Sequence, residues 1–184
     1  LAVDSEGTTY SGEAVEHQRR RYAHRRRNLQ RRATRASRRK LRRISGKQAR
    51  YQRDVNHCIS KAIVATAQRT SSGVALEDLQ GIRERVTARR RQRARMANWG
   101  FAQLRSFITY KARLAGVPVV LVDPRHTSQT CPQCGYVSRA NRPSQSQFSC
   151  LSCGLSGAAD AIAARIIRAR ALVNGPMVLP LAVG

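Results

Sequence analysis

Four cysteines in the C-terminal part of the sequence constrain the fold of this chain more than any other feature. They form two pairs, Cys131-x-x-Cys134 and Cys150-x-x-Cys153, with 15 residues between the pairs and a glycine after each. Four thiolates at this spacing can close tetrahedrally on zinc, which accepts soft ligands and makes such a site structural. Two disulfides or a thioredoxin-like pair are the alternatives. The doubled motif and the lack of a visible secretory signal favour zinc.

The charge of the chain restricts its partners. The 184 residues include 35 Lys or Arg and 10 Asp or Glu, a formal net charge of +25. Such a chain repels itself until a polyanion neutralises it, so nucleic acid is the leading partner and an anionic membrane the alternative. We expect no membrane partner, because no apolar run is long enough to span a bilayer and no basic stretch has a large apolar face.

Most of the basic residues lie in two stretches. Residues 17–53 contain 17 Lys or Arg and no acid, and residues 83–95 contain seven arginines. Phosphate groups of a nucleic acid are the natural ligands of such stretches. The arginines that we expect to contact phosphate are Arg25, Arg31, Arg32, Arg38, Arg39, Arg42, Arg89 and Arg93.

The first basic stretch is expected to be helical. Apolar residues recur at helical spacing from Tyr51 to Thr66, and Ser45-Gly46 interrupts the pattern before them. We predict a basic helical hairpin with helices over about residues 13–43 and 47–69; a disordered basic arm is the alternative. Cys58 falls within the apolar stripe and is predicted to be a small core residue.

Three further segments predict an α/β core. Residues 117–122 form an unbroken apolar run, which predicts a strand buried on both faces in a sheet with helices on both sides. A shorter apolar run, residues 74–76, ends at Glu77. Apolar residues at helical spacing predict one helix that ends near Leu114 and another over residues 158–172.

Acids are scarce, so their positions are informative. Glu77 follows an apolar run, Asp123 ends the strongest predicted strand, and Asp160 lies in the first turn of a predicted helix, where the helix dipole favours an anion. Carboxylates at strand ends and a helix start suit a phosphodiester hydrolase that holds two Mg²⁺ ions. The alternatives at this point are a helix-terminal charge for Asp160 and salt bridges to nearby arginines for Glu77 or Asp78.

Several segments together resemble the C-terminal part of TnpB/OrfB proteins of insertion sequences. These proteins, long described as transposases, are RNA-guided DNA nucleases related to compact type V CRISPR effectors. The most specific segment is VDPRHTSQTCPQCG at residues 122–135, which resembles a hydrophobic-Asp-Pro pattern followed by Thr-Ser-x-x-Cys-x-x-Cys-Gly. The resemblance continues in VALEDL at 74–79, NRP at 141–143, FSCLSCG at 148–154 and ADAIAARII at 159–167.

The resemblance implies an α/β fold: a truncated RNase H-like, RuvC-type core with an inserted basic helical hairpin and an inserted zinc ribbon. By motif match, Glu77 and Asp160 correspond to the second and third catalytic acids, which would bind Mg²⁺. DNA and a guide RNA are the implied partners, and the prokaryotic cytoplasm, at the nucleoid, is the implied location. The implied division is a core over 1–124 and 156–173, the hairpin over 13–69, the ribbon over 125–155 and a loose tail over 174–184.

The start of the sequence departs from the resemblance. In the TnpB/OrfB pattern the first catalytic Asp precedes a Leu-Ala pair and a Ser-Asp-Gly-type turn; here Leu1-Ala2 resembles that pair and Asp4 falls in the turn. We therefore expect the first catalytic acid to be missing and the chain alone not to cleave DNA. One alternative is a non-catalytic zinc-ribbon nucleic-acid-binding protein, a decayed or repurposed transposase; a weaker one is a ribosomal-type basic zinc protein.

Overall fold

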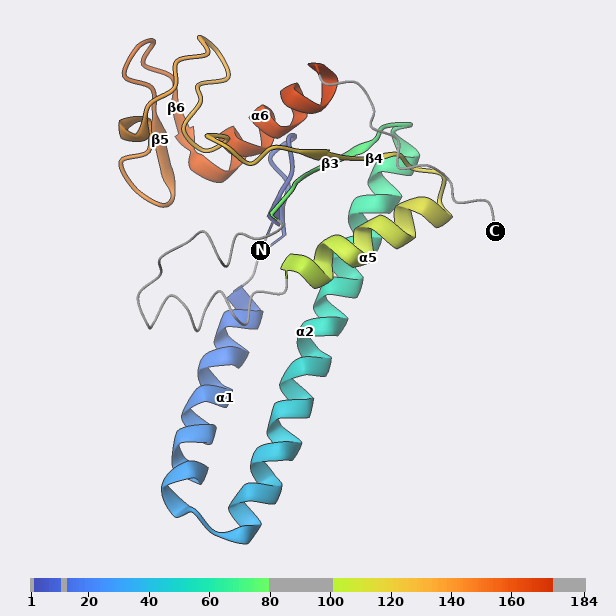
Figure 1. Ribbon diagram of the computed structural model, residues 1–184, viewed down its shortest axis with the longest axis vertical. Helices are drawn as coiled ribbons and strands as arrows, with labels where there is room; N and C mark the ends of the chain where they lie inside the picture. The colour runs from blue at the N-terminus through green and yellow to red at the C-terminus, as the bar shows by residue number, and fades with distance from the viewer. Residues whose placement is uncertain (1, 11–12, 80–100, 174–184) are drawn as a thin grey trace.

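The computed structural model describes residues 2–10, 13–79 and 101–173. These residues form a mixed fold of helices and short strands (Figure 1). Along the chain, the elements are β1 (Ala2–Val3), β2 (Thr9–Tyr10), α1 (Glu13–Arg32), α2 (Arg35–Arg69), β3 (Val74–Glu77), α5 (Phe101–Leu114), β4 (Val119–Val122), the 3-10 turn η1 (Arg139–Asn141), β5 (Gln147–Ser149), β6 (Ser156–Ala158) and α6 (Ala159–Val173). No helix in this described part of the chain has the length and apolar character needed to cross a membrane.

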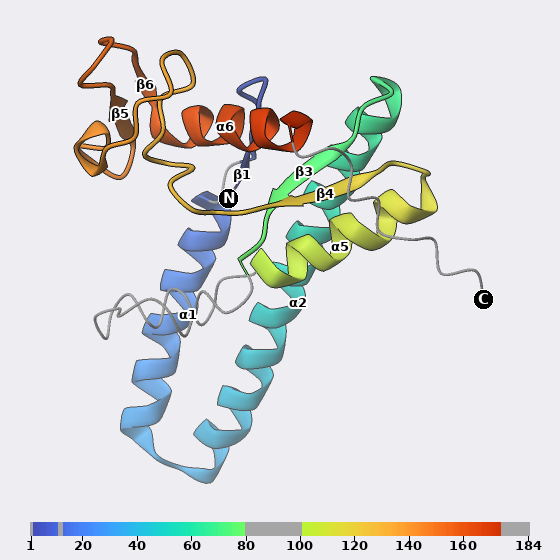
Figure 2. The ribbon, with the colours of Figure 1, turned by 45° about the horizontal axis from the view of Figure 1, so that its top comes forward.

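The parallel pair β3–β4 lies at the centre of the fold. Its register runs from Val74 opposite Val119 to Glu77 opposite Val122, and the backbone N–H of Asp78 extends the ladder to the carbonyl of Val122 at 2.8 Å. Helix α6 covers one face of the pair, while α2 and α5 cover the other (Figure 2). The prediction of a strand between two helical layers is therefore confirmed.

The main hydrophobic core lies between this strand pair and helices α2 and α5. Its buried members are Ile59, Val64, Ala67, Val74, Leu104, Ile108, Ala112, Val117 and Val119. Burying aliphatic side chains contributes about 1.5–3 kcal/mol each relative to exposure, so this cluster holds the long helix α2 to the sheet. The ammonium group of Lys111 adds polar contacts, since it donates to the carbonyl of His57 at 2.6 Å and to Ser60 Oγ at 2.7 Å.

The basic stretch forms a helical hairpin, but the turn is not where the sequence pattern suggested. Helix α1 ends at Arg32, Ala33 adopts a left-handed conformation with φ 50°, and α2 begins after Thr34. The Thr34 side chain caps α2 by accepting from the backbone N–H of Ser37 at 3.1 Å. The predicted break at Ser45-Gly46 is wrong because a glycine inside a helix costs only about 1 kcal/mol, and α2 continues through it.

The predicted apolar stripe of α2 is confirmed in part, because Ile59 is buried in the core and Val55 and Ile63 pack against it, whereas Ala62 and Thr66 are exposed. Cys58 is exposed, so its prediction as a core residue is wrong. The buried side of the helix also carries two polar residues, Asn56 and Ser60. Asn56 donates to Gln103 Oε1 at 2.9 Å and Ser60 accepts from Lys111, so hydrogen bonds to α5 fix which side of α2 faces inward.

A second, smaller core joins the cysteine-containing segment to α6. It consists of Cys131, Phe148, Cys150, Ala159 and Ile162, with Leu155 packed against it. Phe148 and Ala159 are fully buried. The first turns of α6 therefore share a core with the two cysteine knuckles, the turns at residues 131–135 and 150–154. The position of the start of α6 depends on the fold of these turns.

Candidate functional site

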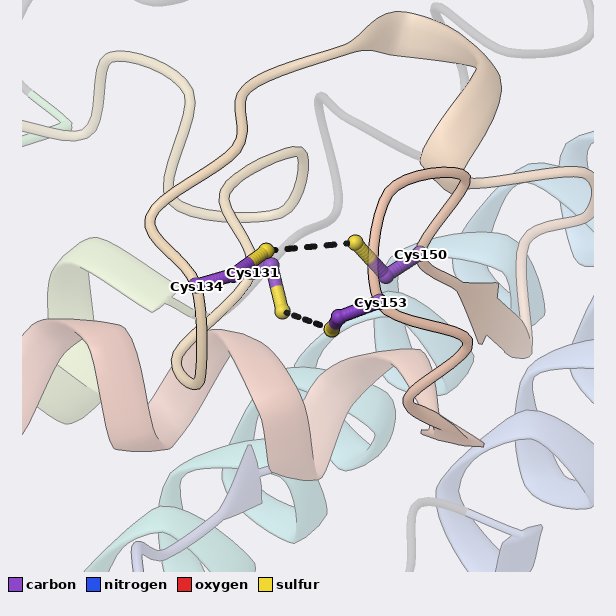
Figure 3. Close-up of side chains that lie close together, drawn as sticks. All are labelled: Cys131, Cys134, Cys150 and Cys153. Carbon is purple, nitrogen blue, oxygen red and sulfur yellow. Dashed lines mark hydrogen bonds between the residues drawn. The ribbon is translucent and has the colours of Figure 1, made fainter.

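The four cysteines of the two pairs converge on one point, as Figure 3 shows. Their Sγ atoms all lie within 4.8 Å of one another, with 3.6 Å between Cys131 and Cys153 and between Cys134 and Cys150. A zinc ion with four bonds of about 2.3 Å to sulfur separates neighbouring sulfurs by about 3.8 Å. The quartet therefore fits zinc, and its thiols are not joined as disulfides. All four ligands would come from the protein.

The two knuckles have the same local structure. Gly135 and Gly154 adopt left-handed conformations, with φ 73° and 76°, and their N–H groups donate to the carbonyls of Cys131 and Cys150 at 3.0 and 3.1 Å. Glycine adopts this backbone conformation without a steric penalty. The Cys-x-x-Cys-Gly pattern therefore serves both the ligand spacing and the turn.

The cysteine pair of the second knuckle has shifted pKa values. Backbone N–H groups, first that of Cys153 and then that of Ser152, lower the pKa of the Cys150 thiol to about 6 although burial raises it. The N–H of Leu155 lowers the pKa of Cys153, but burial and the three neighbouring thiols outweigh it and raise the value to about 12. Crowded thiols cannot all ionise without a cation, which is the role that zinc would fill.

Asn141 ties the two knuckles together from within. Its side chain is fully buried, and its amide nitrogen donates to the carbonyls of Gln129 at 2.9 Å and Tyr136 at 3.2 Å. Its amide oxygen accepts from the N–H of Leu151 at 3.1 Å. One side chain thereby satisfies three backbone groups of two separate loops.

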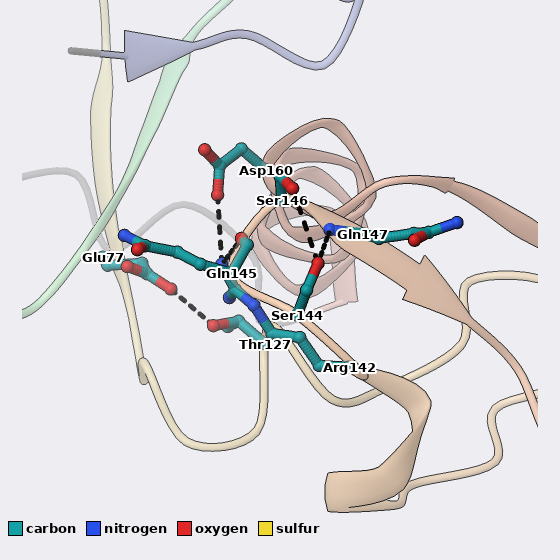
Figure 4. A network of polar contacts seen from close by, with 8 residues as sticks. All are labelled: Glu77, Thr127, Arg142, Ser144, Gln145, Ser146, Gln147 and Asp160. Carbon is teal, nitrogen blue, oxygen red and sulfur yellow. Dashed lines mark hydrogen bonds and ion pairs between the residues drawn. The ribbon is translucent and has the colours of Figure 1, made fainter.

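The two acids singled out by the sequence lie on elements that pack together. Glu77 is half-buried at the carboxyl end of β3, and Asp160 is in the first turn of α6, which contacts both β3 and β4. Glu77 accepts a hydrogen bond from Thr127 Oγ1 at 2.5 Å. Asp160, with 70% of its side chain exposed, pairs with Arg142 at 3.4 Å. Figure 4 shows both carboxylates in one view, with Glu77 bonded to Thr127 and Asp160 paired with Arg142.

Arg142, the partner of Asp160, is a residue that sequence reasoning missed. Its side chain is 25% exposed, and its guanidinium also donates to the carbonyl of Gln145 at 2.6 Å. The signal was present in the Asn-Arg-Pro segment, where the buried Asn141 fixes the backbone next to it. Nothing in the local sequence indicated that the arginine side chain would reach an acid 18 residues later.

Three other acids, Asp4, Asp78 and Asp123, also have hydrogen-bond or ion-pair partners. The Asp4 carboxylate accepts from the N–H groups of Glu6 at 3.0 Å and Thr8 at 2.8 Å, which closes the turn between β1 and β2. Asp78 pairs with Arg105 at 2.8 Å. The Asp123 carboxylate accepts from the N–H of Arg125 at 2.9 Å. These contacts hold turns and helices in place rather than gathering acids at one point.

The basic residues expected to bind phosphate lie along the helical hairpin. Those in the described part of the chain are exposed, and none of them pairs with an acid of that part: Arg25, Arg31, Arg32, Arg38, Arg39 and Arg42. By contrast, Arg19 and Arg20 pair with Glu16 at 2.6 and 3.0 Å near the start of α1. The turn of the hairpin, between α1 and α2, lies far from the core in Figure 1. Arg89 and Arg93 lie outside the described residues.

Comparison with known proteins bears on these features. Residues 101–167 match the family model described as Cas12f1-like, TNB domain. The chain is 38% identical over 125 residues to the CRISPR-associated endodeoxyribonuclease Cas12f1 of Sulfoacidibacillus thermotolerans, an alignment that covers 67% of this chain and 28% of that protein. It is 35% identical over 124 residues to the TnpB-like protein MJ0751 of Methanocaldococcus jannaschii, covering 67% of this chain and 44% of that protein.

The chain is a homologue of the TnpB and Cas12f proteins. The resemblance to the TnpB/OrfB family is therefore confirmed. Its fold is shared with solved Cas12f structures: a Cas12f1–sgRNA–target DNA complex gives a TM-score of 0.67 at 22% identity, covering 85% of this chain and 42% of that chain. A CRISPR–Cas12f ternary complex gives a TM-score of 0.66, also at 22% identity, and the match covers 91% of this chain and 34% of that chain. This TnpB/Cas12f homologue thus spans less than half of each of these relatives.

Proposed function

We propose that this chain is the nuclease portion of a transposon-associated, TnpB-type RNA-guided DNA endonuclease, in which Glu77 and Asp160 hold Mg²⁺ at a RuvC-type active site. The observation that carries the proposal is the packing of α6, which has Asp160 in its first turn, against the parallel β3–β4 pair, whose carboxyl edge holds Glu77. Ligands of open parallel sheets bind outside this edge. The Cas12f-like fold and the names of the relatives support the same reaction class.

The donor set fits the proposed ion. Mg²⁺ prefers hard oxygen ligands, and one or two carboxylates with several waters are typical of its sites. Bound there, Mg²⁺ would supply activation of water and stabilisation of the leaving oxygen. The chain itself contributes the two carboxylates and the guanidinium of Arg142, whose planar donors match phosphate oxygens. Arg142 would thus orient a DNA phosphate beside the two acids.

The remaining parts bind and position. We propose a RuvC-like core over residues 1–124 and 156–173, containing the helical hairpin over 13–69, and a zinc ribbon over 125–155. The exposed arginines around the hairpin turn would bind the sugar–phosphate backbone of DNA or guide RNA by charge and shape. Zinc at the four cysteines would fix the ribbon, from which Arg142 reaches Asp160.

We further propose that the chain on its own binds nucleic acid without cutting it. Glu77 and Asp160 supply two carboxylates, whereas a RuvC-type centre is expected to use three. The Asp4 carboxylate, nearest in sequence to the expected first acid, closes the β1–β2 turn. The second candidate function is therefore a zinc-ribbon nucleic-acid-binding protein without catalysis.

Mn²⁺ binding tests the carboxylate site without requiring activity. In the zinc-loaded chain, Mn²⁺ should broaden the NMR signals of the Asp78 and Ala159 amides at concentrations well below those that broaden the hairpin. Glu77→Gln and Asp160→Asn should each raise the required Mn²⁺ concentration at least tenfold. Asp123→Asn, at the end of the neighbouring strand, is the matched control and should change it less than twofold. Equal broadening in all four proteins would refute the site and favour the non-catalytic alternative.

A further inference from the structure

Thr127 contacts Glu77, a residue far from it in the sequence. It lies in the turn that leads from β4 to the first cysteine knuckle, 50 residues after Glu77. Its side chain is 4% exposed, and its hydroxyl lies 2.5 Å from a carboxylate oxygen of Glu77 and 3.1 Å from the carbonyl of Pro124. A hydroxyl carries one proton, and donation to a carboxylate gives the stronger and shorter bond.

The backbone of the turn holds this hydroxyl in place. The N–H groups of Gln129 and Thr130 donate to the carbonyl of His126 at 2.9 and 3.0 Å, and His126 itself has a left-handed φ of 56°. The Thr130 hydroxyl also donates to that carbonyl at 2.8 Å. Cys131 follows directly and is buried in the core of the knuckles. The position of the Thr127 hydroxyl is therefore fixed by the backbone of the turn that leads to Cys131.

We propose that Thr127 is a positioning residue for Glu77. This inference rests on the proposed function, because it assigns a role in the carboxylate site. The hydroxyl occupies one lone pair of the Glu77 carboxylate and restricts its rotation, which leaves the other lone pairs presented to a cation. Hydrogen-bond partners of metal ligands typically change metal affinity by 10–100-fold when removed.

A buried threonine can also be merely structural, and the chain offers variants that separate the two roles. Thr127→Val keeps the volume and removes the hydroxyl, whereas Thr127→Ser keeps the hydroxyl and removes a methyl group. Thr127→Ala removes the hydroxyl with a smaller side chain, in case valine does not fold. Thr130→Val is the matched control, because it removes a hydroxyl of the same turn that donates to the backbone and not to a carboxylate.

The experiment is the Mn²⁺ titration of the zinc-loaded chain, followed at the Asp78 and Ala159 amides, with zinc content measured for every variant. We expect Thr127→Val and Thr127→Ala to raise the half-broadening concentration about tenfold, and Thr127→Ser and Thr130→Val to stay within twofold of the original chain. If Thr127→Val behaves as the original while Glu77→Gln loses binding, the positioning role is wrong and the proposed function stands. If Glu77→Gln and Asp160→Asn also change nothing, the proposed function itself fails.

Discussion

The guanidinium of Arg142 lies 3.4 Å from the carboxylate of Asp160 and so connects the cysteine-containing segment with the first turn of α6. Arg142 follows the 3-10 turn η1, and Asp160 lies next to Ala159, a member of the second core that also contains Cys150. A cation at this position competes with any metal ion for Asp160, and the same cation is suited to a phosphate. The proposed ribbon thereby sets the charge at the proposed carboxylate site.

Removing this cation should strengthen metal binding by the free chain. Ion pairs of exposed side chains are worth about 0.2–1 kcal/mol, and the Asp160 side chain is 70% exposed. We therefore expect Arg142→Ala to lower the Mn²⁺ concentration for half-broadening about two- to fivefold, and to weaken DNA binding. Arg139→Ala, an exposed arginine of the same 3-10 turn, should leave the Mn²⁺ titration unchanged. Weaker Mn²⁺ binding in Arg142→Ala would contradict this reading.

Asn141 should be the residue on which the ribbon depends most, apart from the cysteines. Asn141→Leu leaves the carbonyls of Gln129 and Tyr136 and the N–H of Leu151 without their partner. Each unsatisfied buried group costs about 1–3 kcal/mol, so the loss of all three bonds should lower the unfolding free energy by at least about 3 kcal/mol and speed zinc release. Asn141→Asp keeps the acceptor for the N–H of Leu151 but sets a buried carboxylate oxygen against both carbonyls, so it should not restore the stability of the original chain. Chemical denaturation measures the stability, and zinc-release kinetics measure the hold on the metal. If Asn141→Leu were as stable as the original chain, the three hydrogen bonds of Asn141 would not hold the two loops together.

Much of this arrangement follows from local sequence, and the rest depends on contacts between distant segments. The spacing of the cysteines predicts their convergence, and the apolar run that ends at Val122 predicts a buried strand, because both signals are contained in a few residues. The burial of Asn56 and Ser60 in α2 was not predicted, because it depends on their hydrogen bonds to α5, which the hydropathy pattern does not indicate. The contact of Thr127 with Glu77 spans 50 residues, and no local pattern could indicate it.

Zinc retention should depend on pH in a defined direction. Protons compete with zinc for the four thiolates, so affinity falls as the pH falls. We expect dialysis at pH 5 to release zinc that is retained at pH 7.5, with loss of the near-ultraviolet signal of the ribbon and of helicity in α6. Metal analysis after dialysis checks this. If the protein contained no zinc at pH 7.5 under reducing conditions, the four cysteines would not be a zinc site.

The hairpin arginines should dominate the salt dependence of nucleic-acid binding. Each phosphate contact contributes about −0.9 to the slope of log affinity against log salt on duplex DNA. Replacing Arg31 and Arg32 by glutamine should make the slope less steep by about 1–2. Replacing Arg19 and Arg20, which Glu16 already neutralises in part, is the matched control in the same helix and should have a smaller effect. An equal effect of both pairs would show that the charge around the turn has no special role.

The ion pairs of Glu16 should stabilise the hairpin to an extent that depends on pH. Hydrogen bonds from Arg19, opposed by desolvation and helped by Arg20, lower the Glu16 pKa from 4.5 to about 2. A carboxylate whose pKa is lower in the folded state stabilises the fold at pH values above its ordinary pKa. This stabilisation is lost as the pH falls toward 2. Because the Glu16 side chain is 34% exposed, we expect Glu16→Gln to cost about 0.5 kcal/mol at pH 7 and nothing near pH 2. Urea unfolding at both pH values measures the difference; a cost that does not change between them would contradict the assignment.

Crystals of the zinc-loaded chain soaked with Mn²⁺ test the central claim most directly. The carboxylate site predicts an anomalous difference peak within about 2.1 Å of oxygens of both Glu77 and Asp160, separate from the zinc at the four cysteines. A second crystal of Glu77→Gln should lose this peak and keep the zinc. A manganese peak that touches neither acid, or none apart from the cysteines, would contradict the proposal that these residues form a nuclease centre.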